Sequence, residues 1–580
     1  MRLRGQKIAC ITYTEVAVRE IWGDVGDDGL FHVSTIHSFL WSVIRTFQLD
    51  IRAWVLGRID EKIEGASTRL ANPRTRAQTR PGLERDIDRY QTQREAVHGL
   101  TRFTYGAGSE YGRGILGHAD VLAAAPAMIE QSQLLREVIA SRFPFVFVDE
   151  SQDTIPAFVA ALRRIADSVP QPFCLGFFGD PMQKIYTTGV GTIEPGPGWE
   201  EITKPENFRC PLRVLDVVNA IRADDDGLEQ TRGRMVERDG VLMPVEGSAR
   251  LFLLPADDRR SERLAEVRRW LSRANDDVLW EDDSSEGDVR ALVVVHRMAA
   301  IRLGFPNIYS ALNDRAPLSL KDGLEDGSAW PLRPFLDYLL PLALAIRGGE
   351  DFEAMSLLRA ECPLLVHGAR PPQLDLSDVL ARLRGATTEL NDLLQRPGAT
   401  IRDVLVFAME RDLLRPDDRW LPFMVVPPPA ADPDNPETGP VTAFLACSVS
   451  ELWGFRRYVQ NMSPFATQQG VKGAEFDRVM VIIDDDEGRA QTLFSYGKYF
   501  GVTPLSDTDR ENISAGQDSV LGRTRRLFYV CCSRAVRDLA VIMFLPDVAA
   551  VRPLIEAKGL FRAEDIVEAS ALEAAFRLDE

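Results

Sequence analysis

The stretch that decides the fold is FPFVFVDESQDT, residues 143–154, in which an apolar strand runs into two adjacent acids, Asp149 and Glu150. This pattern places two carboxylates at the carboxyl end of a strand, where parallel α/β sheets bind ligands. One carboxylate can hold Mg²⁺ through water while the other orients or deprotonates an attacking water. Because an apolar strand followed by Asp-Glu is common, solvated acids with no function explain this stretch equally well on its own.

A second apolar strand ends in a related way. In FCLGFFGDPMQKIY, residues 173–186, the amide of Gln183 follows the strand and can hydrogen-bond a terminal phosphate. Other apolar strands, KIACITYT (7–14), ALVVVHR (291–297) and RVMVIID (478–484), alternate with helical patterns. Such alternation indicates parallel sheets covered by helices on both faces. The sequence therefore predicts an α/β protein with two parallel-sheet domains.

The bulk composition is that of a multidomain globular protein. The chain has 580 residues, of which 45% are hydrophobic and 27% charged, and it is too long for one core. It has neither a long apolar run nor a leader pattern, and its seven cysteines follow no metal-ligand or disulfide spacing. We expect a cytoplasmic protein that does not associate with membranes.

Charge excludes one class of nucleic-acid binder. A net charge of −18 argues against a protein that coats nucleic acid nonspecifically, although a local basic groove is compatible with it. The segment between Arg69 and Arg113 contains nine arginines and five acidic residues. On charge alone, an exposed helical face is the better interpretation of this segment, and a DNA-binding surface is the alternative.

Taken in order, the motifs resemble those of the UvrD/Rep/PcrA helicases of superfamily 1. Each motif is weak alone, whereas the ordered set is specific. The matching segments are ITYTEVAVREI (11–21, motif Ia), VSTIHSFLWSVI (33–44, Ib), VDESQDT (148–154, II), GDPMQKIY (179–186, III), ENFRCP (206–211, IV), FATQQGVKGAEFDRVMVI (465–482, V) and RTRRLFYVCCSRA (523–535, VI).

The resemblance implies two RecA-like domains, each with a mostly helical insertion. We expect the first domain, N-terminally incomplete, to comprise residues 1–47 and 141–235, with an Arg-rich helical insertion at 48–140. The second domain is expected at 236–304 and 456–580, with a helical insertion and Pro-rich linker at 305–455.

The resemblance also implies ATP and Mg²⁺ as cofactors and assigns the catalytic residues. Asp149 would hold Mg²⁺, Glu150 would act on the hydrolytic water, and Gln183 would sense the γ-phosphate. Arg209 and Arg534 would neutralise charge on the transferred phosphoryl group; an arginine finger in related NTPases contributes about 10³–10⁵ in rate.

Three further residues would contact the nucleoside. Phe208 stands where the family usually has a tyrosine that packs on adenine, so stacking is retained and the hydroxyl is lost. Glu475 would accept a hydrogen bond from the ribose, and Gly473 would let the backbone turn closely there.

Five residues would contact single-stranded or partially duplex DNA. Tyr13 would stack on a base, although a half-buried strand aromatic is nearly as good an interpretation. Backbone phosphates would be bound by Thr35, His37 and Ser38. Tyr186 would lie on the same path, but Thr187 and Thr188 follow where the family has a stacking tryptophan, so that base contact of the family's stepping mechanism is missing here.

The first hypothesis is an ATP-dependent 3′–5′ DNA helicase or translocase. The alternative is a non-catalytic DNA-binding or scaffold subunit derived from a helicase, and either is compatible with a protein partner that the sequence does not identify. A fused nuclease is disfavoured, because the tail after residue 544 has no constellation of acids and lysine. No Gly-rich loop ending in Gly-Lys-Ser or Gly-Lys-Thr occurs in the 580 residues, so we expect a misassigned start codon or a gene fragment.

Purified Met1–Glu580 is expected to hydrolyse ATP far below a helicase-like rate. A phosphate loop supplies the backbone N–H donors and the lysine that hold the β- and γ-phosphates in line, and its sequence is missing here. The measurement compares ATP turnover, with single-stranded DNA present, between this chain and a form extended to any in-frame Gly-rich loop upstream. Equal, robust turnover by both forms would show the expectation to be wrong.

Overall fold

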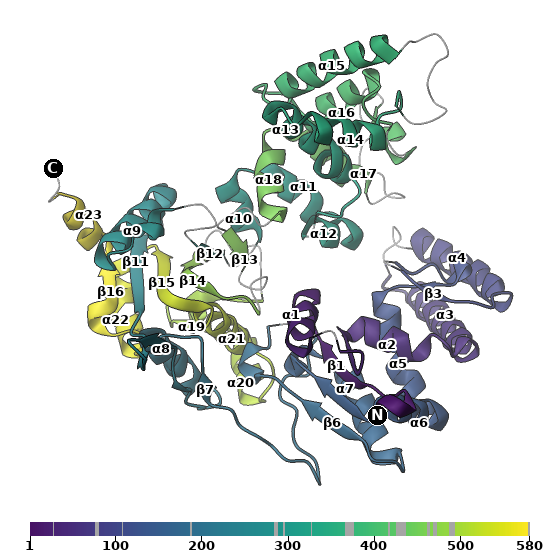
Figure 1. Ribbon diagram of the computed structural model, residues 1–580, viewed down its shortest axis with the longest axis horizontal. Coiled ribbons are helices and arrows are strands. Elements are labelled where there is room, and N and C mark those ends of the chain that lie inside the picture. The colour runs from purple at the N-terminus through teal and green to yellow at the C-terminus, as the bar shows by residue number, and fades with distance from the viewer. Residues whose placement is uncertain are drawn as a thin grey trace. The chain divides into compact units, whose positions relative to one another are not determined.

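A computed structural model describes residues 1–580 except 27, 76–79, 107, 186–187, 283–287, 294–295, 326, 366–375, 416–417, 425–436, 461–464, 468–472, 486–492 and 578–580. The chain forms two compact units, Met1–Lys204 and Pro205–Glu580 (Figure 1). None of the helices within the described ranges has the length and apolarity needed to cross a membrane. Both units combine a parallel sheet with helices, which confirms the predicted α/β fold.

The first unit is built on a four-stranded sheet in the order β2-β1-β5-β6. Its strands are β1 (Ile8–Thr12), β2 (Phe31–Thr35), β5 (Phe145–Val148) and β6 (Cys174–Phe177). Every pairing is parallel, with Ile8 opposite both Phe31 and Phe145. All four carboxyl ends therefore lie at one edge of the sheet.

Helices cover this sheet because their apolar residues recur at helical spacing. They are α1 (Glu15–Val25), α2 (Ile36–Ile44), α5 (His118–Gln131), α6 (Gln133–Arg142) and α7 (Pro156–Ser168). In α2, Phe39, Leu40 and Val43 are buried in the same cluster as Phe158 and Leu162 of α7. At the outer side of the sheet, β6 pairs with no further strand among the described residues, and its Cys174 is exposed.

The segment between α2 and α5 contains a helical pair and a small two-stranded sheet. Its elements are α3 (Gln48–Ala71), α4 (Arg80–His98), β3 (Thr104–Tyr105), the 3-10 turn η3 (Tyr111–Arg113) and β4 (Ile115–Leu116). Several of its arginines form surface ion pairs: Arg89 with Asp86 at 2.7 Å, Arg94 with Asp60 at 2.7 Å, and Arg113 with Glu110 at 3.0 Å. These pairs support the exposed helical face over a strongly basic groove.

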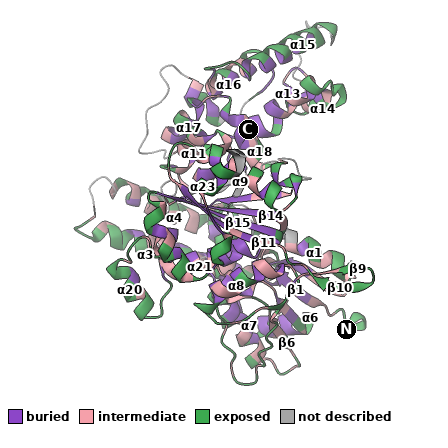
Figure 2. Cartoon of the chain, turned by 90° about the vertical axis from the view of Figure 1, so that its left-hand side faces the viewer, coloured by how far each residue is buried: buried purple, intermediate pink, exposed green. Residues whose placement is uncertain are grey.

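The second unit contains a six-stranded parallel sheet in the order β13-β12-β14-β15-β11-β16. The strands are β11 (Ser248–Pro255), β12 (Val289–Val293), β13 (Phe465–Thr467), β14 (Phe476–Ile483), β15 (Ala535–Leu545) and β16 (Ile566–Glu568). The central strands β14, β15 and β11 are largely buried (Figure 2), because helices pack over both faces. These helices are α9 (Arg260–Ala274), α21 (Val520–Cys532), α22 (Val548–Lys558) and α23 (Ala569–Arg577).

A helical block follows β12 and has a core of its own. It comprises α10 (His296–Leu303), α11 (Pro306–Asn313), α12 (Leu318–Glu325), the π-helix η7 (Pro334–Leu339), α13 (Leu340–Gly348), α14 (Asp351–Glu361), α15 (Leu376–Leu393), α16 (Ile401–Glu410), η8 (Asp418–Met424), α17 (Thr438–Leu445) and α18 (Glu451–Val459). Phe335, Leu390 and Phe444 are buried in this core. Most of the Pro-rich tract expected before α17 lies outside the described residues.

Residues 205–235 differ from the expected boundary, because they pack within the second unit rather than the first. This segment holds β7 (Glu206–Asn207), α8 (Leu212–Ala223) and β8 (Thr231–Arg232). Arg222 of α8, only 2% exposed, donates to the Tyr529 hydroxyl of α21 at 2.8 Å, and the Gln230 amide donates to the same hydroxyl. Side-chain contacts between segments 300 residues apart decide this boundary, and the sequence pattern does not display them.

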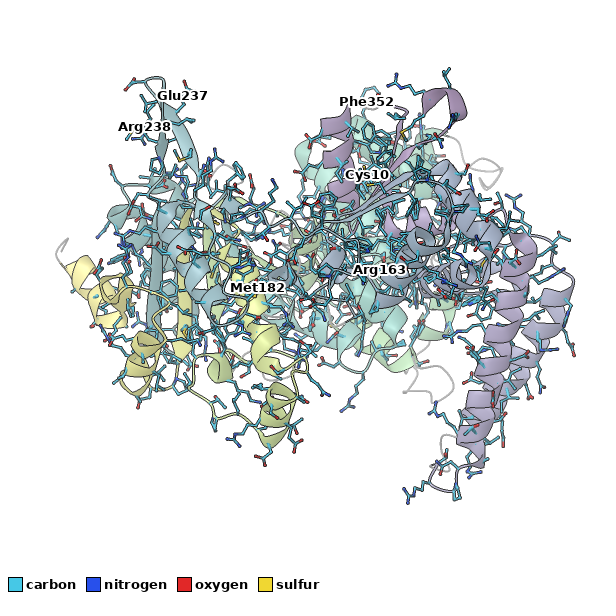
Figure 3. All side chains as sticks on the ribbon, turned by 90° about the horizontal axis from the view of Figure 1, so that it is seen from below. Cys10, Arg163, Met182, Glu237, Arg238 and Phe352 are labelled. Carbon is cyan, nitrogen blue, oxygen red and sulfur yellow. The ribbon has the colours of Figure 1, made fainter. Side chains whose placement is uncertain are left out.

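A hairpin projects from the second unit directly after β8. It consists of β9 (Met235–Arg238) and β10 (Val241–Pro244), and Glu237 and Arg238 lie on its protruding part (Figure 3). Asp239 and Gly240 form its two-residue turn with φ of 54° and 77°, the left-handed conformation that tight hairpins require.

Replacing Arg478 with methionine is expected to destabilise the second unit by about 3–5 kcal/mol. Arg478 is fully buried and donates to Asp277 Oδ2 from Nε at 2.8 Å and from Nη2 at 2.6 Å. The substitution would leave the Asp277 carboxylate buried without this partner. Urea unfolding measures the effect, with Arg259→Met as the control because its ion pair with Glu262 is on the surface. Equal stability of the two variants would contradict the expectation.

Candidate functional site

The carboxyl edge of the first sheet holds the predicted catalytic acids. Asp149 follows β5, and its backbone N–H donates to the Ile11 carbonyl of β1 at 2.7 Å. The buried Thr12 hydroxyl, at the end of β1, donates to Asp149 Oδ2 at 3.3 Å. The Asp149 carboxylate is therefore oriented by the strand beside it as well as by its own.

Glu150 has a strained backbone. Its φ of 51° lies in the left-handed region, which non-glycine residues rarely occupy and which costs free energy. The Gln152 side-chain amide donates to its carboxylate. The 3-10 turn η4 (Ser151–Asp153) starts directly after Glu150, so this left-handed conformation turns the chain immediately after the two acids.

Two glycines let neighbouring loops approach this acidic loop. A Cβ on Gly179, after β6, would lie 2.2 Å from Gln152 Oε1 and 2.7 Å from Ser151 Oγ. On Gly189, a Cβ would lie 2.5 Å from the Gln152 carbonyl oxygen. Backbone bonds close the same contacts, with Ser151 N–H donating to Phe178 O at 2.9 Å and Gly191 N–H donating to Gln152 O at 2.9 Å. The loops after β5 and β6 thus form one packed layer.

Gln183 belongs to this layer through the turn that carries it. The 3-10 turn η5 (Pro181–Gln183) is capped by Asp180, whose Oδ1 accepts from Met182 N–H at 3.0 Å. The Gln183 amide donates to Asp180 Oδ2 at 3.4 Å, and its side chain is half-buried. Asp180 thereby positions Gln183, a role that the sequence did not reveal.

The acidic edge has the chemistry that Mg²⁺ prefers. Asp149 and Glu150 offer carboxylate oxygens, and Thr12 adds a hydroxyl beside Asp149. Mg²⁺ sites typically use one or two carboxylates and complete the shell with water and phosphate oxygens. Within the described ranges, no group of three or more His, Cys, Asp or Glu side chains is placed to hold a metal ion.

The predicted DNA residues lie at the other half of the same edge, after β1 and β2. Tyr13 follows β1 and packs half-buried against the core, which raises the pKa of its phenol. Thr35 ends β2 and caps α2: its Oγ1 accepts from Ser38 N–H at 3.4 Å and donates to Ser38 Oγ at 3.1 Å. His37 is half-buried and Ser38 exposed. Tyr186 lies outside the described residues.

A second group of predicted residues gathers in the second unit. Arg209 Nε donates to Glu475 Oε2 at 2.8 Å, which joins motifs IV and V. Gly473 precedes Glu475 with a φ of 83°, the left-handed conformation that its predicted role requires. Beside them, Phe208 is 67% exposed, and the Arg232 guanidinium lies 4.0 Å from its ring centroid. Arg232 was not foreseen, because nothing in its local sequence marks it.

Arg534 sits differently from Arg209. It is 1% exposed and donates to the Val530 carbonyl at 2.9 Å, to Ser533 Oγ at 2.9 Å and to the Ala474 carbonyl at 3.3 Å. Its own carbonyl accepts from Phe476 N–H at 3.0 Å, which fixes the start of β14 to that of β15. In this conformation Arg534 supports the turn that carries Glu475.

Part of the chain matches a known helicase family. Residues 58–193 match a model described as the UvrD/REP helicase N-terminal domain. The resemblance to the UvrD/Rep helicases is confirmed. The chain is similar to Gabija protein GajB of Bacillus cereus (strain HuB5-5), at 20% identity over 94% of this chain and 89% of that protein. It is also similar to RecBCD enzyme subunit RecB of Escherichia coli (strain K12), at 31% identity over 24% of this chain and 12% of RecB.

Replacing Gly189 with alanine is expected to destabilise the first unit by about 1–3 kcal/mol. The added methyl group would meet the backbone of the acidic loop at Gln152 and Asp153, which cannot yield as a flexible side chain does. The matched control is Gly196→Ala, whose Cβ would meet only Trp199, at 3.5 Å. Thermal unfolding of both variants tests this, and an unchanged midpoint for Gly189→Ala would contradict the proposed close packing.

Proposed function

We propose that this UvrD-like protein is an ATP-dependent translocase that moves 3′ to 5′ on single-stranded DNA and unwinds partial duplexes. The observation that carries the proposal is the acidic edge of the first unit, where Asp149 and the strained Glu150 follow β5. Asp149 bonds to the end of β1, and the next residue after the acids, Ser151, bonds to Phe178 after β6. Parallel sheets bind nucleotides at this edge. The neighbouring ends of β1 and β2 provide the side chains proposed for DNA.

The roles of the acids follow from their different surroundings. Asp149, held by Thr12 and the end of β1, is proposed to bind Mg²⁺ through water. Glu150 accepts from the Gln152 amide and is proposed to orient the attacking water. Gln183, positioned by Asp180, would detect the γ-phosphate and report its presence to the chain around η5. ATP supplies the free energy for movement.

Two arginines are proposed to act on the phosphates in different ways. Arg209 is partly exposed and paired with Glu475, so a nucleotide can exchange this pair for a contact with phosphate. Glu475, released in the same event, would be able to accept from the ribose. Arg534 is held by backbone carbonyls, and we therefore assign it first to positioning Glu475. Its access to phosphate would require a change in this turn.

A second candidate function is a non-catalytic DNA-binding subunit. It is favoured by the absence of a Gly-Lys-Ser or Gly-Lys-Thr loop in the 580 residues. The conformation around Asp149 and Glu150 favours the catalytic proposal, because a strained acidic residue costs stability and such a cost is expected where the residue has a function.

We propose a cytoplasmic setting for this protein. The similarity to GajB makes a Gabija system the natural place to look for a protein partner.

The catalytic proposal predicts that Glu150→Gln abolishes DNA-stimulated ATP hydrolysis while leaving DNA binding within about twofold of the unsubstituted protein, since the carboxylate acts on water rather than on DNA. The control is Glu130→Gln on the surface of α5, next to Arg164. Both variants are tested in the 580-residue chain and in a longer chain that includes the residues encoded by any in-frame codons upstream of Met1.

Unwinding of duplexes with a 3′ or a 5′ single-stranded tail then tests the direction of movement. Unwinding that requires a 3′ tail supports the proposal. Unwinding that requires a 5′ tail would refute the assigned direction. DNA binding without ATP turnover in every form would favour the non-catalytic subunit.

A further inference from the structure

Four aromatic rings form a patch beside the DNA half of the first site. His37 and Trp41 are four residues apart on α2, so they lie on one helix face. Tyr105 of β3 and His118, the first residue of α5, come from the segment after α3 and α4. Ring centroids are 6.1 Å apart for Trp41 and Tyr105, 5.2 Å for Tyr105 and His118, and 5.2 Å for His118 and His37. We call these four residues the aromatic patch.

Hydrogen bonds hold the patch in place. The Tyr105 hydroxyl bonds His118 Nδ1. Burial raises the pKa of the Tyr105 phenol, so its hydroxyl stays protonated at neutral pH. The turn before His118 is fixed by the buried Asp120, which accepts from Tyr111 Oη at 2.7 Å and from Gly117 N–H at 3.1 Å.

The patch is open to solvent on one side and packed on the other. His118 is exposed, whereas His37, Trp41 and Tyr105 are half-buried, with Trp41 and Tyr105 resting on the core. The pKa of His37 is lowered by burial and by the nearby His118, which favours a neutral ring. A preorganised set of rings, one of which is exposed, suits nucleobases better than phosphates.

We infer that the aromatic patch of Trp41, Tyr105, His118 and His37 is a stacking site for bases of single-stranded DNA, built jointly by α2 and the segment that follows it. The inference rests on the proposed function, because it continues the DNA path proposed at Thr35 and Ser38. It changes the part played by His37, which joins the stacking surface instead of pairing with a phosphate. Tyr105 and His118 become DNA-binding residues that no motif assigned.

The alternative is a purely structural role, in which these rings only pack between α2 and the neighbouring segment. It accounts for Trp41 and Tyr105, which pack on the core, and it does not account for the exposed His118 placed between Tyr105 and His37. Two of the four rings also lie on α2, whose N-cap is Thr35 and whose first turn carries Ser38 of the proposed DNA path. These two facts favour a binding surface.

Binding of a fluorescein-labelled single-stranded DNA of about 16 nucleotides tests the inference. The double substitution Tyr105→Leu with His118→Ala is expected to weaken binding by about tenfold or more, since stacking on a protein aromatic is worth a factor of about 5 to 150 per base. Tyr105→Phe keeps the ring but loses the bond to His118 Nδ1, so it should lose clearly less affinity than the double variant. His98→Ala, an exposed histidine at the end of α4, is the matched control and should change nothing.

Salt dependence separates stacking from phosphate binding. If the patch stacks on bases, the double variant loses affinity without a change in the slope of log Kd against log salt, because no counterion is released by a stacked base. An oligonucleotide with abasic positions should then bind the double variant and the unsubstituted protein equally. A changed slope would overturn stacking in favour of phosphate contacts.

The remaining outcomes also decide the question. If the unsubstituted protein binds DNA and the double variant, with an unchanged thermal midpoint, binds equally well, the inference is wrong and the proposed function stands. If the unsubstituted protein does not bind single-stranded DNA, both fail. Tighter binding to RNA of the same sequence would overturn the assignment to DNA.

Discussion

The arrangement of the first unit depends on how closely the loops after β5 and β6 approach one another at the carboxyl edge of its sheet. Glycine at positions 179 and 189 removes the side chains that would collide with Ser151, Gln152 and Asp153. The acidic loop can then turn sharply behind Glu150, in a conformation that an isolated peptide would seldom adopt. Backbone hydrogen bonds from neighbouring segments offset this cost, and they fix both acids relative to the sheet.

The fold was predictable because its signals are local. Apolar strands that end in Asp149-Glu150 and Gly179-Asp180 each became a parallel strand at the expected place. The alternation of strands and helices also indicated two parallel-sheet domains, and the family resemblance added a mostly helical insertion to each. The sequence could not show that residues 205–235 pack in the second unit, since that depends on Arg222 and Gln230 meeting Tyr529 far along the chain. Boundaries decided by such long-range contacts have no periodic pattern to reveal them.

The candidate site was predictable in composition and less so in detail. Arg209 and Glu475 were both predicted to contact the nucleotide, and they form an ion pair with each other that neither motif alone indicates. Arg232 over Phe208 and Asp180 beside Gln183 were not foreseen, because ring and amide partners depend on three-dimensional packing. For Arg534, the sequence suggested a phosphate contact. Its bonds to the Val530 and Ala474 carbonyls instead stabilise the turn that carries Glu475. The contacts of an individual side chain therefore depend on three-dimensional packing, which a sequence motif does not show.

Among the described residues β6 is the outermost strand of its sheet, and this position has a consequence for handling the protein. All seven cysteines lie within the described part of the chain, and Cys174 on β6 is the one classed as exposed; four of the others, including Cys210 and Cys531, are fully buried. Exposed strand edges favour pairing between molecules, and a thiol on such an edge can convert a transient encounter into a covalent dimer by air oxidation. Purification under a reducing agent, or with serine at position 174, removes this route to dimers while leaving the buried thiols untouched.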